Sequence, residues 1–161
     1  MTFENIVLVV GGTLTGLLAG LLYSFSVAIV PALRSLKATQ HIAAMQSINV
    51  KIINPIFFLS FFGPVVLLPL AAFLHRGQPG FVLLVAAAII QILGANGVTM
   101  FGNIPLNNEL AKVDVTKISE EEADKIRKEF QGPGKPWMRF HTIRTLAAII
   151  STALVFIVCL S

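Results

Sequence analysis

The residues best suited to chemistry gather where a long apolar segment ends, in NGVTMFGNIPLNN at residues 96–108. Asn96, Thr99, Asn103 and Asn107 recur at helical spacing and should share one face of a helix. Polar side chains within an apolar segment are costly unless they are buried against other protein. This face therefore predicts either hydrogen bonds between helices or the wall of a binding pocket.

The proline in the same stretch predicts a local departure from regular helix. Pro105 removes one donor from the helix ladder and biases Ile104 away from helical backbone angles. We expect a kinked or unwound helix end here. Such backbone is tolerated in a membrane only where protein or a water-filled cavity surrounds it.

A second group of candidate residues precedes the last apolar run, residues 146–160. Trp137, His141 and Arg144 fall at positions i, i+4 and i+7, on one helix face. A histidine can act as a base near neutral pH, an arginine can hold an anion, and amides can stabilise an enolate oxygen. The alternative is that Trp137 and Arg144 anchor a helix at the membrane interface.

Several other chemistries find no support in the sequence. Residues 5–108 contain no Asp or Glu, which makes hydrolysis by paired carboxylates a poor candidate. No glycine-rich phosphate loop or Ser-His-acid pattern is present. Cys159 is the only cysteine, so neither an intrachain disulfide nor a thiolate metal cluster can form. We predict no metal and no other cofactor; a site formed by His41 and His141 is the alternative, and His75 is expected in a solvated loop.

Composition identifies the elements that must position these residues as membrane helices. The chain has 161 residues, of which 55% are hydrophobic and 12% charged, with a mean hydropathy of +0.82. This is typical of an integral membrane protein with about four spans. We predict an all-α, four-helix membrane bundle forming a single domain, with spans at 5–30, 56–73, 81–101 and 140–160. The N-terminus lacks the basic region of a secretory signal, so we expect the first span to be retained.

Shorter features complete the predicted bundle. Gly12, Gly16 and Gly20 recur every fourth residue, a pattern that permits close helix packing. Residues 39–55 should form an amphipathic helix before the second span, and Asn54 before Pro55 is typical of an N-cap. Between spans three and four, residues 109–139 form a charged connection. Within it, a capping box from Ser119 to Glu122 predicts a surface helix at 120–130.

The distribution of basic residues predicts the topology. Eleven of the twelve Lys and Arg residues lie around the first and third connections, and only Arg76 lies in the second. In a bacterial inner membrane, this places those two connections in the cytoplasm and both termini outside. The net charge of +4 therefore reflects topology rather than nucleic-acid binding.

This topology should bring the polar candidate residues together at one end of the bundle. They are Tyr23, Gln46, Asn49, Asn54, Thr99, Asn103, Asn107, Asn108, Trp137, His141 and Arg144. A polar cavity open at one face suits a substrate site or an assembly surface better than a channel.

Four segments of the chain resemble a known family. They are GLLAGLLYSFSVAIVPAL, AMQSINVKIINPIF, GVTMFGNIPLNNEL and WMRFHTIRTLAAIIS. Together they resemble the anthrone oxygenase-like family of small four-span membrane proteins, and the similarity covers most of the chain. The resemblance implies oxidation of a polycyclic phenolic anthrone to an anthraquinone by molecular oxygen, without a metal or flavin. It implies the fold more firmly than the substrate.

The resemblance also implies roles for the candidate residues. His141 would remove the acidic ring proton, and Arg144 would hold a phenolate or peroxide anion. Trp137 would stack on the aromatic ring, and three carboxamides would stabilise the enolate: Asn103, Asn107 and Asn108. The remaining substrate-binding candidates are Thr99, Gln46, Asn49, Asn54 and Tyr23.

The expected partners are the lipid bilayer, a hydrophobic aromatic molecule and molecular oxygen, and a homo-oligomer is compatible with the sequence. The alternatives are a non-enzymatic ligand-binding or accessory protein, in which the amides join helices, and a transporter.

Overall fold

The computed structural model describes residues 2–160, and every regular element in that range is a helix. Four helical segments are long and apolar enough to cross a membrane. The prediction of an all-α, four-span membrane bundle is therefore confirmed. In chain order, with η marking a π-helical turn, the elements are α1 (Phe3–Ser24), η1 (Phe25–Ile29), α2 (Val30–Arg34), α3 (Ala38–Lys51), α4 (Pro55–Leu74), α5 (Phe81–Ile89), η2 (Ile90–Gly97), η3 (Thr99–Asn103), α6 (Ile104–Ala111), α7 (Glu120–Gln131) and α8 (Pro136–Cys159).

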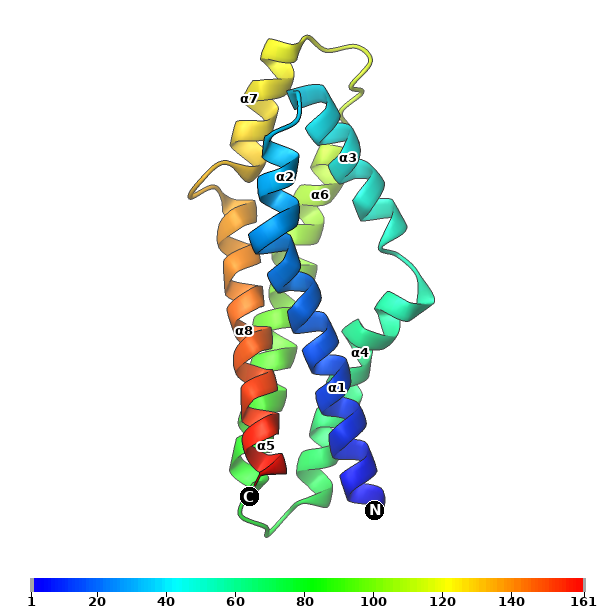
Figure 1. The fold of residues 1–161 in the computed structure, drawn as a ribbon, viewed down its shortest axis with the longest axis vertical. Helices are drawn as coiled ribbons and strands as arrows, with labels where there is room; N and C mark the ends of the chain where they lie inside the picture. The colour runs from blue at the N-terminus through cyan, green and yellow to red at the C-terminus, as the bar shows by residue number, and fades with distance from the viewer. Residues whose placement is uncertain (1, 161) are drawn as a thin grey trace.

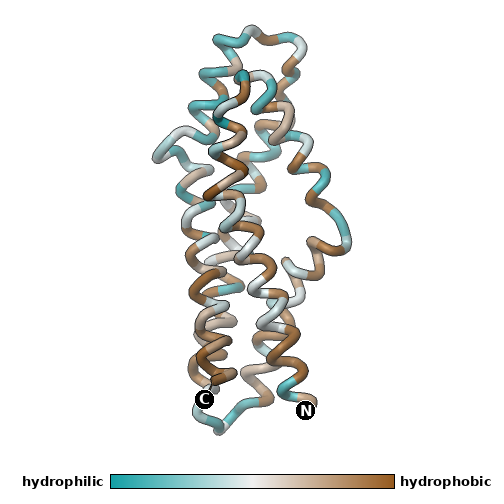
Figure 2. The backbone as a smooth tube through the Cα atoms, viewed as in Figure 1, coloured by the Kyte–Doolittle hydropathy of each residue, from teal (hydrophilic) through white to brown (hydrophobic). Residues whose placement is uncertain are grey.

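The long helices run side by side, and the charged connections gather at one end of the bundle (Figure 1). That end, which holds α3, α7 and the end of α6, is called the connection end. The opposite end, called the terminal end, holds the first turn of α1, the last turn of α8 and the turn between α4 and α5. Hydrophilic residues concentrate at the connection end, whereas the bundle toward the terminal end is mostly hydrophobic (Figure 2).

The first and third helices are longer than a bilayer is thick. Phe3–Arg34 has 32 residues and Phe81–Ala111 has 31. At 1.5 Å per residue, each reaches more than about 45 Å, against roughly 30 Å of hydrocarbon. Both helices therefore continue past the predicted spans at the connection end, farther than a hydrocarbon layer of this thickness requires.

Two prolines within these helices are accommodated by π-helical turns. Pro31 follows η1, in which the N–H just before the proline donates to the carbonyl of Phe25, five residues back. Pro105 follows η3, where the corresponding bond reaches the carbonyl of Thr99. A widened turn makes room for the proline ring while the neighbouring carbonyls stay bonded. Of the kinked or unwound end predicted at Pro105, the unwound form is wrong, because the backbone stays helical from 81 to 111; the departure from regular α-helix is the π-helical turn η3.

The glycine pattern of α1 marks only one close crossing. A Cβ placed on Gly12 would lie 2.8 Å from Cγ1 of Val155 in α8, so α1 and α8 pack tightly there. At Gly16 the nearest atom would be an ordinary 3.7 Å away, and at Gly20 nothing lies within 4 Å. The close packing predicted for this pattern thus occurs at its first position, whereas Gly16 makes an ordinary contact with α8 and Gly20 is exposed.

Helices α3 and α7 form an outer layer at the connection end. The Glu120 carboxylate accepts hydrogen bonds from the N–H groups of Ala38 and Thr39, at 3.0 and 3.4 Å, and from the Thr39 hydroxyl. These N–H groups lie in the first turn of α3, where a helix offers them no carbonyl partner. Glu120, the first residue of α7, therefore joins α3 to α7. The predicted cap is present as well, because the Glu122 N–H donates to Ser119 Oγ at 3.2 Å.

A buried histidine lies between the two outer helices. His41 of α3 is 0% exposed, and its Nε2–H donates to Oε1 of Gln131 at the end of α7, 2.8 Å away. Burial lowers the pKa of His41 below its ordinary 6.5, and the charges of Arg127 and Arg34 lower it further. The Leu33 carbonyl, which would accept from the protonated ring, and the hydrogen bond to Gln131 oppose the shift in part.

Acidification should loosen this outer layer. The detached state takes up a proton on His41 as the pH falls through about 6.5, whereas the buried imidazole does so only at lower pH. The layer is therefore fully stable above this pH and loses up to about 1.4 kcal/mol per pH unit below it. Hydrogen exchange of residues 38–51 and 120–131 should rise between pH 7.5 and 5. His41→Gln, which keeps a donor for Gln131 but does not titrate, should show a flat profile; an equal rise in both proteins would contradict the assignment.

The histidine in the α4–α5 turn is buried, which corrects the prediction of a solvated residue. His75 is only 6% exposed, and its Nδ1–H donates to the carbonyl of Ala71 at 2.8 Å. The last carbonyls of a helix have no partner within the helix, so a side-chain donor four residues on is favoured there. His75 thus closes the end of α4.

Candidate active site

Trp137, His141 and Arg144 form a stripe on α8 that points into the bundle. Their exposed fractions are 1%, 0% and 9%, so Trp137 and Arg144 are not lipid-facing anchors. The indole and imidazole rings stack, with centroids 5.0 Å apart and planes 20° from parallel. The guanidinium carbon of Arg144 lies 5.7 Å from the centroid of the indole, within cation–π range.

Hydrogen bonds fix the protonation of the imidazole. Nδ1 of His141 lies 3.3 Å from Nε and 3.1 Å from Nη2 of Arg144. A guanidinium can only donate, so Nδ1 is the unprotonated nitrogen. Nε2 then carries the hydrogen and donates to Ser26 Oγ at 2.9 Å, while that hydroxyl donates to the Leu22 carbonyl at 3.2 Å. The imidazole is neutral, and both of its nitrogens have partners.

Arg144 is a buried cation without a counter-charge. Beyond His141, its polar partner is the Thr99 hydroxyl, 3.4 Å from Nη1. Among residues 2–160, no carboxylate forms an ion pair with it. Removing a guanidinium from water is costly when only neutral groups face it. The arrangement therefore favours an anion beside Arg144.

Two carboxamides bind Trp137. Asn107 Oδ1 accepts from the indole Nε1–H at 2.7 Å, and Asn103 Nδ2 donates to the Trp137 carbonyl at 3.0 Å. Asn103 is 0% exposed, and its Oδ1 has no hydrogen-bond partner among the described residues. Buried polar atoms are rarely left unpaired, so this oxygen marks a place for a donor. The unpartnered atom of Asn103 is thus an acceptor, whereas the enolate role predicted for it would use the second hydrogen of Nδ2.

The two π-helical turns supply the other walls. Phe25 and Ser26 belong to η1, and Thr99 and Asn103 belong to η3. The Phe25 ring meets the imidazole edge-on, with centroids 6.1 Å apart. Phe130 of α7 covers the indole at 5.5 Å. Phe25, Ser26 and Phe130 were not among the predicted site residues; the one signal for the first two is their position within two turns before Pro31.

Other predicted site residues lie apart from this cluster. Gln46 donates to the carbonyls of Leu110 and Val113, both at 2.8 Å, and so closes the end of α6. Asn54 is the N-cap of α4, with Oδ1 accepting from the N–H of Phe57 at 3.0 Å. Asn49 is half-buried, with Nδ2 unpartnered. Tyr23 and Asn108 are exposed.

The fourth polar residue of the third helix has a structural partner. Asn96 is 4% exposed and donates to the carbonyl of Phe61 in α4 at 2.6 Å, while it accepts from Gln91 at 3.0 Å. It therefore joins two spans in the middle of the bundle. Asn96, Thr99, Asn103 and Asn107 all turn inward, as their spacing predicted, but only the last three reach the stripe on α8.

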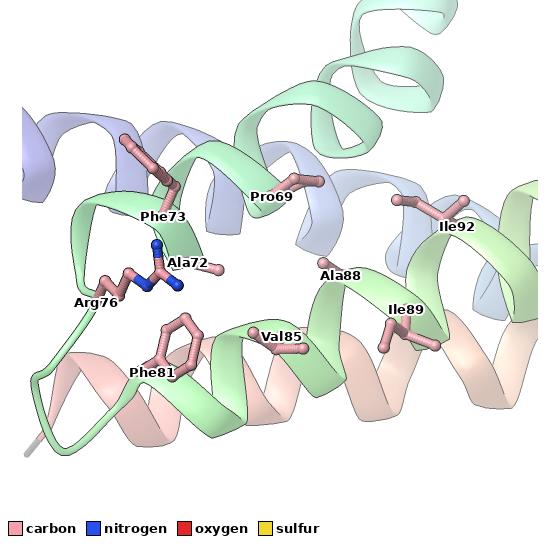
Figure 3. Close-up of a pocket in the computed structure, with 9 residues that line it drawn as sticks. All are labelled: Pro69, Ala72, Phe73, Arg76, Phe81, Val85, Ala88, Ile89 and Ile92. Carbon is pink, nitrogen blue, oxygen red and sulfur yellow. The ribbon is translucent and has the colours of Figure 1, made fainter.

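Two hollows of the structure lie away from the stripe. A groove of about 380 Å³ runs between α4 and α5 near the terminal end (Figure 3). Another, of about 440 Å³, lies around His75 and Gln78. Within residues 2–160, no three His, Cys, Asp or Glu side chains gather as a metal site would require.

Fold and site together define a four-span membrane protein with an aromatic, cationic cluster buried at one end of its bundle. The family model described as anthrone oxygenase matches residues 57–154, which is more than half of the chain. The chain therefore belongs to the anthrone oxygenase family. No curated protein and no solved structure matches it. The matched region carries Thr99, Asn103 and the α8 stripe, whereas η1 precedes it.

Proposed function

We propose that this protein is a membrane-embedded oxygenase that converts a phenolic, anthrone-type aromatic to a quinone with molecular oxygen. The observation that carries the proposal is the contact between a neutral imidazole and a guanidinium that lacks a counter-charge. A base and an anion site lie side by side, within aromatic surroundings. Family membership supports oxygenase chemistry, and the proposal requires no metal or flavin.

The contact between His141 and Arg144 suggests how substrate would activate the base. In the free protein, Arg144 occupies the lone pair of Nδ1. A phenolate oxygen of the substrate would attract the guanidinium and draw it from the imidazole, because a charged acceptor binds it more strongly than a neutral one. Nδ1 would then be free to remove a proton from the ring methylene. The unpartnered Oδ1 of Asn103 would accept a hydrogen bond from a second phenolic hydroxyl.

The reaction balances without an added oxidant other than oxygen. Loss of one methylene proton to His141 leaves an electron-rich enolate. Transfer of its electrons to molecular oxygen forms a carbon–oxygen bond, and protonation gives a hydroperoxide. Loss of the remaining methylene hydrogen and cleavage of the oxygen–oxygen bond then release water and leave the second quinone carbonyl. Arg144 is placed to stabilise the phenolate and then the peroxide anion.

The depth of the site fits a substrate that is apolar with polar edges. Cys159 lies eighteen positions beyond His141 in α8, which corresponds to about 27 Å of helix. If α8 begins its crossing near Cys159, His141 lies close to the far boundary of a hydrocarbon layer of roughly 30 Å. Amphipathic aromatic molecules collect at this boundary. We further propose that the connection end faces the cytoplasm of a bacterial cell, on the distribution of Lys and Arg.

A non-enzymatic ligand-binding or accessory role is the competing function. It is favoured by the hydrogen bonds of Asn96, Asn107 and Gln46, each of which joins elements of the fold. It is also favoured by the covering of Trp137 by His141 and Phe130, which leaves the indole faces in contact with protein. In that case the cluster holds η1, η3 and α8 together, and no turnover occurs.

Oxygen uptake distinguishes the two functions. Purified protein should consume oxygen with at least one member of a panel of phenolic anthrones in the presence of chelator. His141→Ala should lower the rate at least about 100-fold, because the base is lost. His75→Ala is the matched control, since that imidazole closes a helix at the terminal end, and it should keep the rate. A panel without uptake by folded wild-type protein, or full activity of His141→Ala, would contradict the proposal.

Thermal unfolding in detergent supplies the second readout. If His141 serves catalysis, His141→Gln should unfold near the wild-type temperature while its turnover is lost. A large fall in unfolding temperature for His141→Gln, with no oxygen uptake by the wild type, would favour the accessory role.

A further inference from the structure

The groove between α4 and α5 has one chemical character along its length. Its walls are apolar and include Pro69, Phe73, Val85, Ile89 and Ile92. Phe73 and Ile89 are 65% and 53% exposed, so the groove opens on the outside of the bundle rather than into its core. Figure 3 shows α4 diverging from α5 toward Ile92. A flexible hydrocarbon chain lying along the helices fits such a space, whereas a polar ligand finds no partner within it.

A single cation lies at the end of this groove where α4 and α5 are joined. Arg76 follows α4 by two residues, and its guanidinium lies beside Ala72 and Phe73 at the closed end of the groove (Figure 3). Within residues 2–160 it forms no ion pair, and Glu4, the acid of α1 at this end, accepts a hydrogen bond from Gln78 at 3.3 Å. The guanidinium is therefore free to bind an anion.

The position of Arg76 in the chain is also exceptional. The other eleven basic residues lie at the connection end, which is where the charge bias of membrane proteins places them. Arg76 stands alone at the opposite membrane boundary, immediately beyond an apolar span. Phosphate esters at that depth are the head groups of phospholipids, and guanidinium binds phosphate through two parallel hydrogen bonds.

We propose that the groove between α4 and α5 binds one anionic phospholipid, with an acyl chain along the apolar wall and the phosphate on Arg76. The site is separate from the stripe on α8 and does not depend on the proposed oxygenase function. A zwitterionic lipid carries an ammonium group near its phosphate, and Arg76 repels this cation, so an anionic lipid gains relative to a zwitterionic one. One basic residue near a membrane surface contributes about 1 kcal/mol toward anionic lipid, or roughly fivefold in affinity.

The test measures retained lipid on the intact protein. Protein purified in detergent is incubated with vesicles of dioleoyl phosphatidylglycerol or dioleoyl phosphatidylcholine, isolated again and analysed by native mass spectrometry. Wild type should retain one phosphatidylglycerol, with about fivefold preference over phosphatidylcholine. Arg76→Gln should abolish the preference, and Arg76→Lys should keep part of it. Arg76 is exposed, so its variants leave the bundle intact.

A groove-filling pair separates a specific site from the general lipid shell. Val85→Trp places an indole in the groove and should remove the retained lipid. Val82→Trp adds the same side chain to α5 at a position that is 70% exposed and outside the groove, and it should leave retention unchanged. Equal retention of the two lipids by wild type, or retention by Val85→Trp equal to that of Val82→Trp, would overturn the proposal.

Discussion

Arg144→Met is expected to abolish oxygen uptake while leaving the unfolding temperature unchanged or higher. Arg144 is buried at 9% exposure, and His141, Thr99 and the face of Trp137 are its neighbours. Replacing buried charge with a well-packed apolar side chain is often neutral or stabilising, by about 1 to 4 kcal/mol. The loss of anion stabilisation should reduce turnover by about 100- to 1,000-fold. If Arg144 instead served stability, Arg144→Met would lower the unfolding temperature and leave oxygen uptake per folded molecule unchanged.

The measurement pairs thermal unfolding in detergent with oxygen uptake on the same preparations. Arg144→Lys is the matched control, because it keeps the charge but loses the fork of donors. It should retain some activity with a raised KM. A fall of several degrees in unfolding temperature for Arg144→Met, without loss of turnover per folded molecule, would show that Arg144 is a structural residue.

Gly94→Val should be among the most destabilising single substitutions in the membrane part of the fold. A Cβ on Gly94 would lie 2.6 Å from the Cβ of Ala147, and the backbone of Ala147 lies 4.0 Å from it. Neither neighbour is the flexible end of a side chain, so η2 and α8 must move apart. Overpacking of this kind costs about 3 kcal/mol. Because η2 leads directly into η3, the displacement should also separate Thr99 from α8.

Gly20→Val provides the comparison for this substitution. Nothing lies within 4 Å of a Cβ at Gly20, so its effect should stay within about 1 kcal/mol, the range of helix propensity alone. Both variants would be compared by thermal unfolding in detergent. Equal unfolding temperatures would contradict the close packing of η2 on α8.

Apolar run length and helix-capping signals were sufficient to predict the helical architecture. The four spans, the helix before α4, and α7 with its Ser119 cap lie where hydropathy and capping signals place them. Helix ends were less predictable. The first and third helices continue about a turn or more beyond their apolar runs, because packing against α3 and α7 stabilises polar helix outside the membrane. His75 was misjudged because a turn of six residues, 75–80, can still bury a ring against the helix it follows.

The site was predictable where one helix carries it and less so where several helices meet. The i, i+4, i+7 spacing correctly placed Trp137, His141 and Arg144 on one inward face. No spacing rule linked Ser26 to His141, since 115 residues separate them and a π-helical turn sets the direction of the side chain. Amide side chains were equally ambiguous: Asn54 caps a helix, whereas Asn103 retains an unpaired oxygen, and sequence does not distinguish these roles.

The bond from Arg144 to Nδ1 of His141 has a consequence for substrate selection. Under the proposed mechanism, a neutral aromatic of the right shape could occupy the site and still leave the base engaged. Only a molecule that brings its own negative oxygen would release it. Substrates that ionise and analogues that do not would then differ in kcat more than in KM. The non-ionising analogues would act as competitive inhibitors.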